Sequence, residues 1–326
     1  MGSIKEIMKE DNINISNDKV AQLPLVSICS ITYNHAPYIR QCLDGFLMQK
    51  TNFKYEIIIH DDASTDGTTE IIKEYAEKYP DLITPVFQTE NQYSKGLRGF
   101  FAKFVFPHAK GKYIALCEGD DFWIDPYKLQ KQVDFMEANP EYSMCFHSIK
   151  EILDESVKDI LSKPIMQELK IKDYDGIEIL KKWTIPTCSV LFNNNCYRKS
   201  KYLERIKSNN YIYGDIILFL SLAETGKIRC LTNKPLAIYR RHIGGITFKL
   251  DGLWEKKIKH FENIKNDFNG KYAITCNLFL APLYFDLFTS YYSINKFNSF
   301  YYLIKSFFCS PQTTINRIKM LAMKKH

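Results

Sequence analysis

The sequence has few of the features that mark the common cofactor-binding and cross-linked folds. Its nine cysteines are odd in number, include no CxxC pair and lie mostly inside apolar runs, so reduced and buried cysteines are expected. Nothing repeats at a solenoid period, and with 14 Gly and 12 Pro the 326-residue chain is neither collagen-like nor wholly disordered. No GxGxxG follows the first apolar run, which argues against a hydride-transferring Rossmann enzyme.

Acidic residues are scarce in the last quarter of the chain. The formal charge is +7. From Lys249 onward the chain has 12 Lys and Arg and 5 Asp and Glu, whereas residues 1–248 have 32 of each sign. The main fold therefore carries no basic excess that would form a nucleic-acid groove, and no nucleic-acid partner is expected. The whole excess belongs to the C-terminal segment 249–326, which is also rich in Phe and Tyr.

The segment 249–326 is predicted to form a basic, aromatic, helical appendage. No run in it reaches the roughly 18 apolar residues of a spanning helix, because Pro282, Asp286 and Lys296 interrupt. Contact with a membrane surface, a solvated tail, a helical cap on the core and a homodimer contact stay open as alternatives. Residues 1 to 20 contain no signal-peptide core, so a cytoplasmic protein, peripheral on the inner face of the plasma membrane through this segment, is expected.

Strands and helices alternate in the first half of the chain. Short apolar runs predict strands at 25–31, 55–60, 82–87 and 113–117. Apolar residues at three- and four-residue spacings predict helices between them, around 39–47, 71–76 and 100–105. Because parallel strands need crossovers, this order predicts an α/β fold with a mostly parallel sheet flanked by helices. Such sheets bind ligands at the carboxyl ends of their strands.

The alternation is looser after residue 126. A helix is expected at 129–136, and short strands are expected at 144–146, 188–192, 228–231 and 236–239. A second helix is expected from Asp215 to Thr225, with Gly226 as its cap, whereas 150–175 is mainly polar. From Trp254 to the end the pattern is helical and aromatic.

Two acidic clusters follow predicted strands. Asp61-Asp62 ends the second strand, and Glu118-Gly119-Asp120-Asp121 follows the fourth. Carboxylates at the ends of neighbouring parallel strands point into one crevice, where they repel one another unless a cation or a donor-rich ligand is present. Oxygen ligands suit a hard divalent ion, Mn2+ or Mg2+, which keeps positions open for a substrate phosphate. Capping of turns and helices is the alternative for each acid.

Three segments carry a family resemblance: Val26–Asn34 (VSICSITYN), His60–Thr68 (HDDASTDGT) and Cys117–Trp123 (CEGDDFW). In order and spacing they resemble glycosyltransferase family 2, strongly over 24–150 and weakly over 180–245. The resemblance implies a GT-A fold, a nucleotide-sugar donor and inversion at the anomeric carbon. It divides the chain into a lead-in (1–23), a catalytic domain (24–248) and the appendage (249–326). Within the catalytic domain, 24–126 would bind the nucleotide sugar and 127–248 the acceptor.

The resemblance also implies roles for single residues. A loop after the first strand would meet the nucleoside, and it consists of Thr32, Tyr33 and Asn34. Asp62 would accept the ring N–H of a uracil or thymine base, which favours a UDP- or dTDP-sugar. In the DxD-type motif, Glu118 would reach the ribose, and Asp120 and Asp121 would hold the metal next to the donor. Glu118 stands where the family more often has Asp.

Two matches to the family pattern lie in the second half. Asp215, at the expected start of a helix, would be the base that takes the proton of the acceptor hydroxyl, and capping of that helix is the alternative. The run Tyr239–Gly245 (YRRHIGG) would close over the donor. In it, Arg240 and Arg241 would bind the diphosphate, and neutral His242 would ligate the ion.

These expectations together describe the inverting transfer of a sugar from a UDP- or dTDP-sugar to a hydroxyl of a saccharide or lipid-linked acceptor, in bacterial surface polysaccharide synthesis. A sugar-nucleotide nucleotidyltransferase is the alternative within the same fold, but it would carry a Gly-rich basic loop where this chain has Thr32–His35. A non-catalytic GT-A-fold binding protein is the alternative of another class, and the retained acids count against it.

Overall fold

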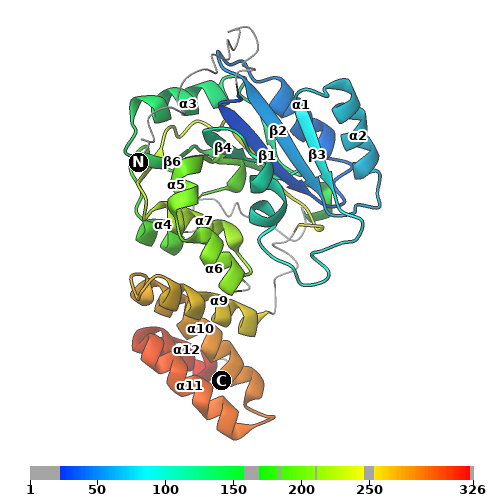
Figure 1. The fold of residues 1–326 in the computed structure, drawn as a ribbon. Helices are drawn as coiled ribbons and strands as arrows, with labels where there is room; N and C mark the ends of the chain where they lie inside the picture. The colour runs from blue at the N-terminus through cyan, green and yellow to red at the C-terminus, as the bar shows by residue number, and fades with distance from the viewer. Residues whose placement is uncertain (1–22, 158–168, 183–184, 210, 246–252, 324–326) are drawn as a thin grey trace, which may run out of the picture.

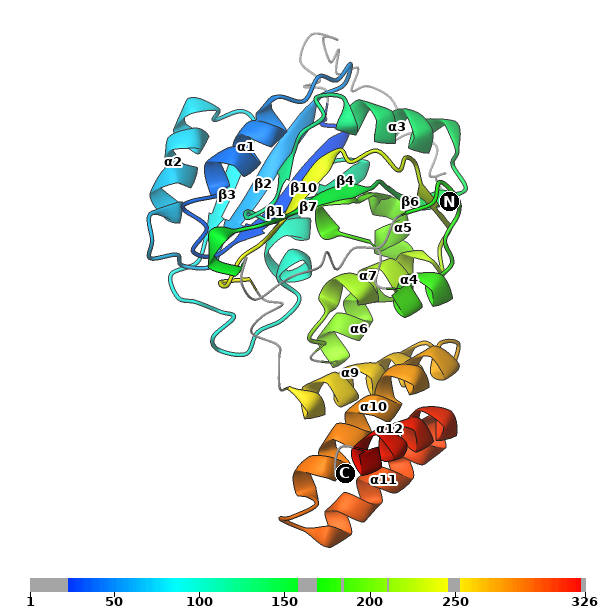
Figure 2. The ribbon, with the colours of Figure 1, turned by 180° about the vertical axis from the view of Figure 1, so that it is seen from behind.

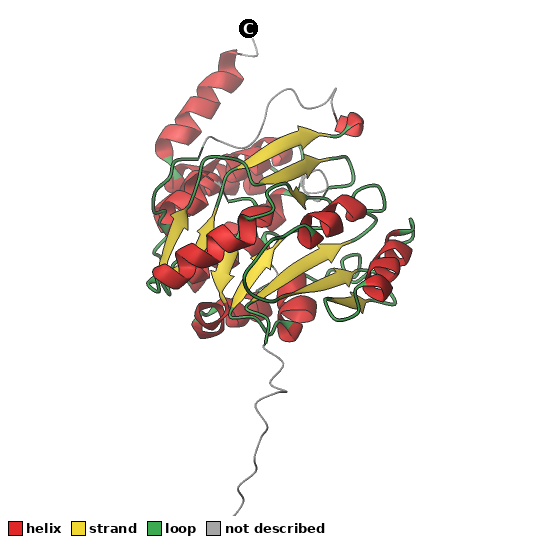
Figure 3. Cartoon of the chain, turned by 90° about the horizontal axis from the view of Figure 1, so that it is seen from above, coloured by secondary structure: helices red, strands yellow, loops and turns green. Residues whose placement is uncertain are grey.

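The computed structural model describes residues 23–157, 169–182, 185–209, 211–245 and 253–323. A seven-stranded sheet in the order β3-β2-β1-β4-β8-β6-β9 forms its centre, with helices on both faces (Figures 1 and 3). The strands are β1 Val26–Thr32, β2 Tyr55–Asp61, β3 Ile83–Phe87, β4 Tyr113–Leu116, β6 Tyr142–Phe146, β8 Leu191–Asn193 and β9 Lys227–Cys230. Among these strands only β8 runs antiparallel to its neighbours, which confirms the predicted α/β class with a mostly parallel sheet.

The central strands present apolar side chains to both faces, because consecutive strand residues point in opposite directions. Ile28 and Ile57 pack on one face, and Cys29 and Ile58 on the other. Helices α1 (Ile39–Leu47), α2 (Thr68–Lys78) and α3 (Lys128–Ala138) cover the first face. The second face is covered by α4 Gly176–Lys182, α5 Asn194–Lys199, α6 Tyr202–Ser208 and α7 Gly214–Leu222.

The carboxyl ends of β1, β2 and β4 meet at one edge of the sheet. β1 lies in the middle and pairs in parallel with β2 on one side and with β4 on the other. The loop after β2 is joined to β1 by the Asp62 N–H, which donates to the Thr32 carbonyl at 3.1 Å. The loop after β4 is joined by the Gly119 N–H, which donates to the Ile31 carbonyl at 3.0 Å. The two acidic clusters therefore flank the end of β1.

A second sheet of three short strands, β5-β10-β7, lies beside this edge (Figure 2). Its strands are β5 Phe122–Trp123, β7 Ile149–Leu153 and β10 Ala237–Arg241. β5 begins directly after the acidic motif and pairs antiparallel with β10, so the end of β10 comes next to that motif. β7 corrects the expectation of a polar stretch without a strand at 150–175. Its sequence, IKEIL, lacks the strict alternation that predicts a strand.

Over residues 253–323 the C-terminal appendage consists of four helices: α9 Trp254–Asp267, α10 Ala273–Tyr291, α11 Lys296–Cys309 and α12 Pro311–Met323. Side chains of α9 and α10 belong to the same buried cluster as α7 and the sheet, so these two helices cap the core. α11 and α12 form an outer layer at the end of the molecule furthest from the sheet (Figures 1 and 2). The described residues do not include residue 249, the predicted start of the appendage, or residues 1–22 of the predicted lead-in.

α10 differs from the expectation that no segment is apolar enough to span a membrane. Its 19 residues suffice by length and composition, although 39% of that span is buried inside the fold. Pro282 and Asp286 lie within the helix, where Arg317 of α12 donates to the Pro282 carbonyl (2.8 Å) and to Asp286 (2.6 Å). α10 contacts α9, α11 and α12, so it is the central helix of the appendage.

His260 of α9 joins the appendage to the sheet domain. Its buried ring packs edge-on against Tyr211 and Tyr213, just before α7. Neither ring nitrogen has a hydrogen-bond partner among the described residues, and burial lowers the pKa of His260 to about 3. An unfolded histidine has a pKa of about 6.5. Below that pH the unfolded chain takes up a proton that the folded chain does not, so the free energy of unfolding falls as the pH falls.

His260→Phe is expected to reduce this acid sensitivity. Between pH 7 and pH 5 the variant should lose about 2 kcal/mol less of its unfolding free energy than the wild type, because one coupled proton uptake is gone. Urea unfolding at the two pH values measures the difference. The same replacement at His108, an exposed histidine, is the matched control. Equal losses in wild type and His260→Phe would show that His260 is not held neutral by burial.

Candidate active site

The acidic motif Glu118–Asp121 turns directly out of β4 at the end of β1. Gly119 permits this turn, because a Cβ there would lie 2.7 Å from Thr32 Oγ1 and 2.8 Å from Thr32 Cβ, closer than side chains pack. The Asp121 N–H donates back to the Glu118 carbonyl at 3.0 Å. The motif is therefore a tight turn held against the central strand of the sheet.

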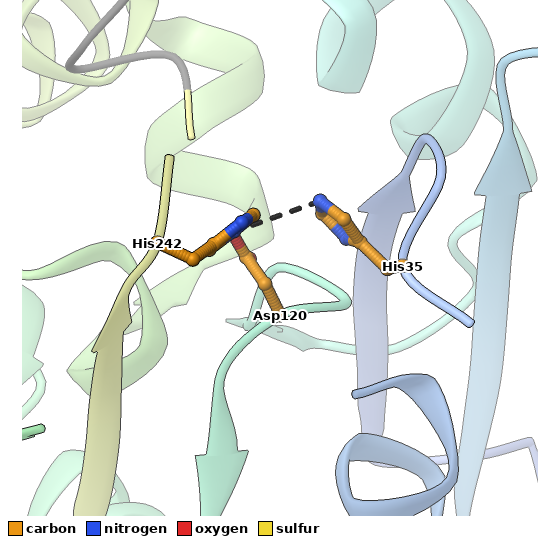
Figure 4. Close-up of side chains that lie close together, drawn as sticks. All are labelled: His35, Asp120 and His242. Carbon is orange, nitrogen blue, oxygen red and sulfur yellow. Dashed lines mark hydrogen bonds and ion pairs between the residues drawn. The ribbon is translucent and has the colours of Figure 1, made fainter. Parts of the chain in front are cut away.

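Asp120 lies between two histidines from distant parts of the chain (Figure 4). His242, after β10, places Nε2 3.0 Å from Asp120 Oδ2. His35, after β1, places Nε2 3.7 Å from the same oxygen. The three ligand atoms all lie within 4.8 Å of one another. Nitrogen and oxygen ligands sit about 2.0–2.2 Å from a divalent ion, so ligand atoms spaced in this way suit one shared ion.

Asp120 also belongs to a second group of candidate metal ligands. Glu118, Asp120 and Asp121 also bring one oxygen each within 4.8 Å of one another. The Oδ1 of buried Asp121 accepts the Arg240 backbone N–H at 2.8 Å. Asp121 Oδ2 and Asp120 Oδ1 are buried and have no hydrogen-bond partner within the part of the chain that the structure describes. Buried carboxylate oxygens without donors are costly, and a bound cation would satisfy both.

The charges of the motif depend on one another. Burial, Asp120 and Asp215 raise the pKa of Glu118 to about 8. Burial, Asp120 and Glu118 raise the pKa of Asp121 well above its usual range. Burial would also raise the pKa of Asp120, but the two histidines reverse this effect and the pKa is lowered overall. The motif thus has one stabilised negative charge and two acids that ionise fully only beside a cation.

Asp215 lies in the first turn of α7. Its charge contributes to the raised pKa of Glu118, which brings it into the electrostatic range of the acidic motif. Burial raises the pKa of Asp215 itself, and a backbone hydrogen bond from Ile216 partly offsets this effect. A partly buried carboxylate with a raised pKa beside other acids is typical of a general base. The residue predicted as the base therefore interacts electrostatically with the acidic motif, and its role as the base stays a prediction.

The loop after β1 is tied to the loop after β2. Asn34 has a φ of 54°, its N–H donates to Ser64 Oγ at 2.8 Å, and its Oδ1 accepts the Thr65 N–H at 2.9 Å. The His35 N–H donates to Thr68 Oγ1 at 2.8 Å. These bonds orient the loop so that the His35 side chain points towards Asp120. Asn34 therefore orders the loop in which the nucleoside contact is predicted.

Asp62 is buried, and each of its oxygens accepts a backbone N–H from the segment after β3. Gln92 donates to Oδ1 at 2.8 Å and Tyr93 to Oδ2 at 3.0 Å. A carboxylate has about four acceptor positions, so the predicted contact with a base N–H is compatible with these bonds. Thr32 and Tyr33, the other predicted contacts, lie next to Asp62 at the end of β1.

The two arginines at the end of β10 lie on opposite sides of the strand, as neighbouring strand residues do. Arg240 is at the acidic motif, where its Nε donates to the Asp120 carbonyl at 3.1 Å and its Nη2 donates to Gln41 Oε1 at 2.6 Å. Arg241 instead forms a buried ion pair with Glu151 of β7 at 2.9 Å. The sequence predicts that Arg241 binds the diphosphate of the donor. Its side chain instead holds β10 to β7 through the ion pair with Glu151.

His35 belongs to this site although no sequence pattern singles it out. A lone histidine after a strand has no ligand spacing to indicate a metal. The pairing of β10 with β5 brings the His242 ring to 5.7 Å from the His35 ring, between ring centroids. The one available signal is the position of His35, in the loop at the carboxyl end of the central strand.

A model of the family described as glycosyl transferase family 2 matches residues 27–202, more than half of the chain. The chain belongs to this family. An uncharacterized protein of Mycobacterium tuberculosis is 41% identical over 221 residues, which are 68% of this chain and 60% of that protein. The UDP-Glc:alpha-D-GlcNAc-diphosphoundecaprenol beta-1,3-glucosyltransferase WfaP of Escherichia coli is 36% identical over 225 residues, 69% of this chain and 80% of that enzyme. The match thus spans about 60% of the length of the mycobacterial relative.

A solved structure shares the fold. Residues 1–349 of TarS from S. aureus, in complex with UDP-GlcNAc, match 89% of this chain and 82% of that chain with a TM-score of 0.60. The two sequences are 16% identical over this match, so the likeness establishes the fold alone. The GT-A fold that the sequence resemblance implies is confirmed.

Proposed function

We propose that this protein is an inverting glycosyltransferase that moves a sugar from a UDP- or dTDP-sugar to a hydroxyl of a saccharide or lipid-linked acceptor. The observation that carries the proposal is the convergence of Asp120 and two imidazoles at the carboxyl edge of one sheet. Such edges are where α/β folds bind their ligands. Membership of glycosyl transferase family 2 supports the reaction class.

In this proposal a divalent cation is held by Asp120, Asp121 and His242, with His35 as an additional ligand. The buried oxygens of Asp120 and Asp121 that have no partner in the described part of the chain fit this role. Mg2+ prefers oxygen ligands, whereas imidazole suits transition metals, so two histidines favour Mn2+ over Mg2+. When bound, the ion would offset the negative charge of the departing nucleoside diphosphate.

Asp215 is the base of the proposed reaction. It takes the proton of the acceptor hydroxyl as that oxygen bonds to the anomeric carbon and the bond from this carbon to the diphosphate breaks. A hydroxyl is too weak an acid to lose its proton at neutral pH without such a base, and the raised pKa of Asp215 makes it a stronger base than an exposed aspartate. One displacement of this kind inverts the anomeric configuration.

The donor nucleotide is proposed to lie along the end of β1, between the loops that follow β1 and β2. Asp62, fixed by two backbone N–H groups, would accept the ring N–H of uracil or thymine. Arg240 would meet the diphosphate and Glu118 the ribose. The loop that borders the nucleoside consists of Thr32, Tyr33 and Asn34.

The names of two relatives support the proposed acceptor and role. The Escherichia coli relative is named for transfer from UDP-Glc to GlcNAc-diphosphoundecaprenol. A Bacillus subtilis relative, 37% identical over 127 residues, carries a name from teichuronic acid biosynthesis. We therefore propose a role in bacterial surface polysaccharide synthesis, at the cytoplasmic face of the plasma membrane.

Screening nucleotide sugars tests this proposal. With Mn2+, the purified protein is expected to release UDP or dTDP from at least one UDP- or dTDP-sugar, faster when saccharide-diphosphate-lipid acceptors are added, and EDTA is expected to stop the release. A nucleotidyltransferase would instead release pyrophosphate from a nucleoside triphosphate and a sugar phosphate. A binding protein would release neither. Each of these two results would overturn the proposal.

A further inference from the structure

Polar groups hold α11 to its neighbours in the appendage. Ser299 Oγ donates to the Phe288 carbonyl of α10 at 2.9 Å. Ser306 Oγ donates to the Ala281 carbonyl, also at 2.9 Å, and lies 2.7 Å from the Thr314 hydroxyl of α12. Ser299 and Ser306, seven residues apart, are the two buried residues of α11. The inward face of this helix therefore combines two buried serines with the partly buried Tyr302 and Cys309, which pack against the core.

The outward face of α11 is apolar along the whole helix. Its side chains recur at three- and four-residue spacings, so they form one stripe, and Phe297 and Phe308 are each 81% exposed. We call this stripe the α11 aromatic face; it consists of Phe297, Phe300, Tyr301, Ile304, Phe307 and Phe308. An apolar groove of about 250 Å3 between α11 and α12 continues it, lined by Leu303, Ile304, Phe307, Phe308, Thr314 and Ile318.

The two fully buried side chains of α11 are polar and its most exposed side chains are apolar, unlike those of a typical helix on the surface of a protein in water. Such a helix buries its apolar stripe and exposes its polar one. Small hydroxyl residues that bond helices together, with large apolar side chains facing out, are typical of helices in contact with lipid. On folded proteins, contiguous exposed apolar patches mark binding surfaces. The α11 aromatic face therefore fits an apolar partner.

The charges around this face have one sign. No Asp or Glu occurs from residue 287 to the end of the chain, whereas six Lys and Arg do. Lys305 and Arg317 pair with acids of α9 and α10. Lys296, at the start of α11, and Lys319, in α12, are exposed. The partner is therefore expected to be anionic as well as apolar.

We propose that the α11 aromatic face inserts into the surface of a bilayer that contains anionic lipids, with α11 and α12 lying in the plane of the interface. Aromatic rings at headgroup depth and lysines that reach the headgroups are the usual anchors of such helices. α11 and α12 lie at the end of the molecule furthest from the sheet, so the bilayer would leave the acidic motif uncovered (Figures 1 and 2).

A second copy of this chain is the other apolar partner that the face could accept. A two-fold contact brings the same surface of each copy together. In such a contact Lys296 and Lys319 would face a copy of the segment 287–326, which has no acid to pair with them. Anionic headgroups complement these charges, which favours the bilayer.

Flotation of the full chain with vesicles tests the proposal. The wild type is expected to float with vesicles of phosphatidylcholine and phosphatidylglycerol. Its affinity for vesicles of pure phosphatidylcholine should be about fivefold lower for each Lys or Arg that no longer meets an anionic headgroup. Phe297→Glu/Phe308→Glu is expected to weaken binding to the anionic vesicles at least about tenfold. Ile171→Glu, at a residue that is 53% exposed outside the appendage, is the matched control and is expected to bind like the wild type.

Circular dichroism and thermal unfolding show whether the double variant keeps its fold. Phe297→Ser/Phe308→Ser, which removes the rings without adding charge, is the second variant and is also expected to bind weakly. Equal vesicle binding by the wild type and both variants would overturn the proposal. So would a wild type that floats with no vesicle but forms dimers, measured by light scattering, that both variants dissociate.

Discussion

Asp215→Asn is expected to lower kcat for sugar transfer by about 10²–10⁴-fold, the usual contribution of a positioned general base. Asn has nearly the same size and shape as Asp, so the first turn of α7, in which Asp215 lies, should be preserved. The amide, however, cannot take the proton of the acceptor hydroxyl. The affinity for UDP is expected to stay within about twofold, because the donor does not need the base. Steady-state kinetics and a UDP titration measure the two effects separately.

The pH dependence of kcat/KM tests the same residue. Burial raises the pKa of Asp215 above the usual aspartate value. Protonated Asp215 cannot act as a base, so kcat/KM should fall on acidification at a higher pH than it would with an exposed aspartate as the base. The Asp215→Asn variant should lack this acidic limb of the pH profile.

Asp175→Asn is the matched control for Asp215→Asn. Asp175 also stands at the start of a helix, where its Oδ1 accepts the Glu178 N–H of α4 at 2.8 Å. This variant is expected to keep wild-type kinetics. Wild-type turnover by Asp215→Asn would mean that Asp215 has only a structural role in the first turn of α7. The proposed mechanism would then lack a base.

Asp120→Asn is expected to be the most damaging single change to the metal site. Asp120 belongs to both sets of candidate ligands, and its lowered pKa shows that the two histidines stabilise its charge. A neutral amide would bind a divalent ion far more weakly, so kcat/KM at a fixed Mn2+ concentration should fall by about 10³-fold or more. Titration of Mn2+, followed by electron paramagnetic resonance, should show the loss of binding directly.

Asp125→Asn provides the comparison for this change. Asp125 lies just beyond the motif and pairs with Lys131 at 2.7 Å, and both Mn2+ affinity and turnover are expected to survive its replacement. If Asp120→Asn binds Mn2+ and turns over like Asp125→Asn, Asp120 is not a metal ligand.

The parallel half of the sheet can be predicted from the sequence because β1, β2 and β4 are near-continuous apolar runs. Such runs indicate burial on both faces, and burial on both faces indicates crossover helices. The placement of the acids follows from the same argument: Asp62 and Asp120 come directly after parallel strands that share an edge. The region of the site is thus predictable before any side-chain geometry is known.

The details that depend on distant contacts are not predictable from local pattern. His242 meets Asp120 and His35 because β10, more than 100 residues after the acidic motif, pairs beside that motif. Arg241 lies with Glu151 because strand register, which neighbouring residues do not reveal, decides the side on which each arginine lies. The helical period of α11 identifies an aromatic stripe but does not show whether that stripe faces inward or outward.

Calorimetric titration of UDP and dTDP, with Mn2+ and with EDTA, tests most directly whether the end of β1 is a metal-dependent nucleotide site. We predict that one nucleotide binds per chain when Mn2+ is present, that EDTA weakens this binding at least about tenfold, and that the Asp120→Asn variant behaves like the EDTA-treated wild type. Equal nucleotide affinity in Mn2+ and in EDTA, or no binding in either, would contradict the assignment of the acidic motif to a metal and a nucleotide sugar.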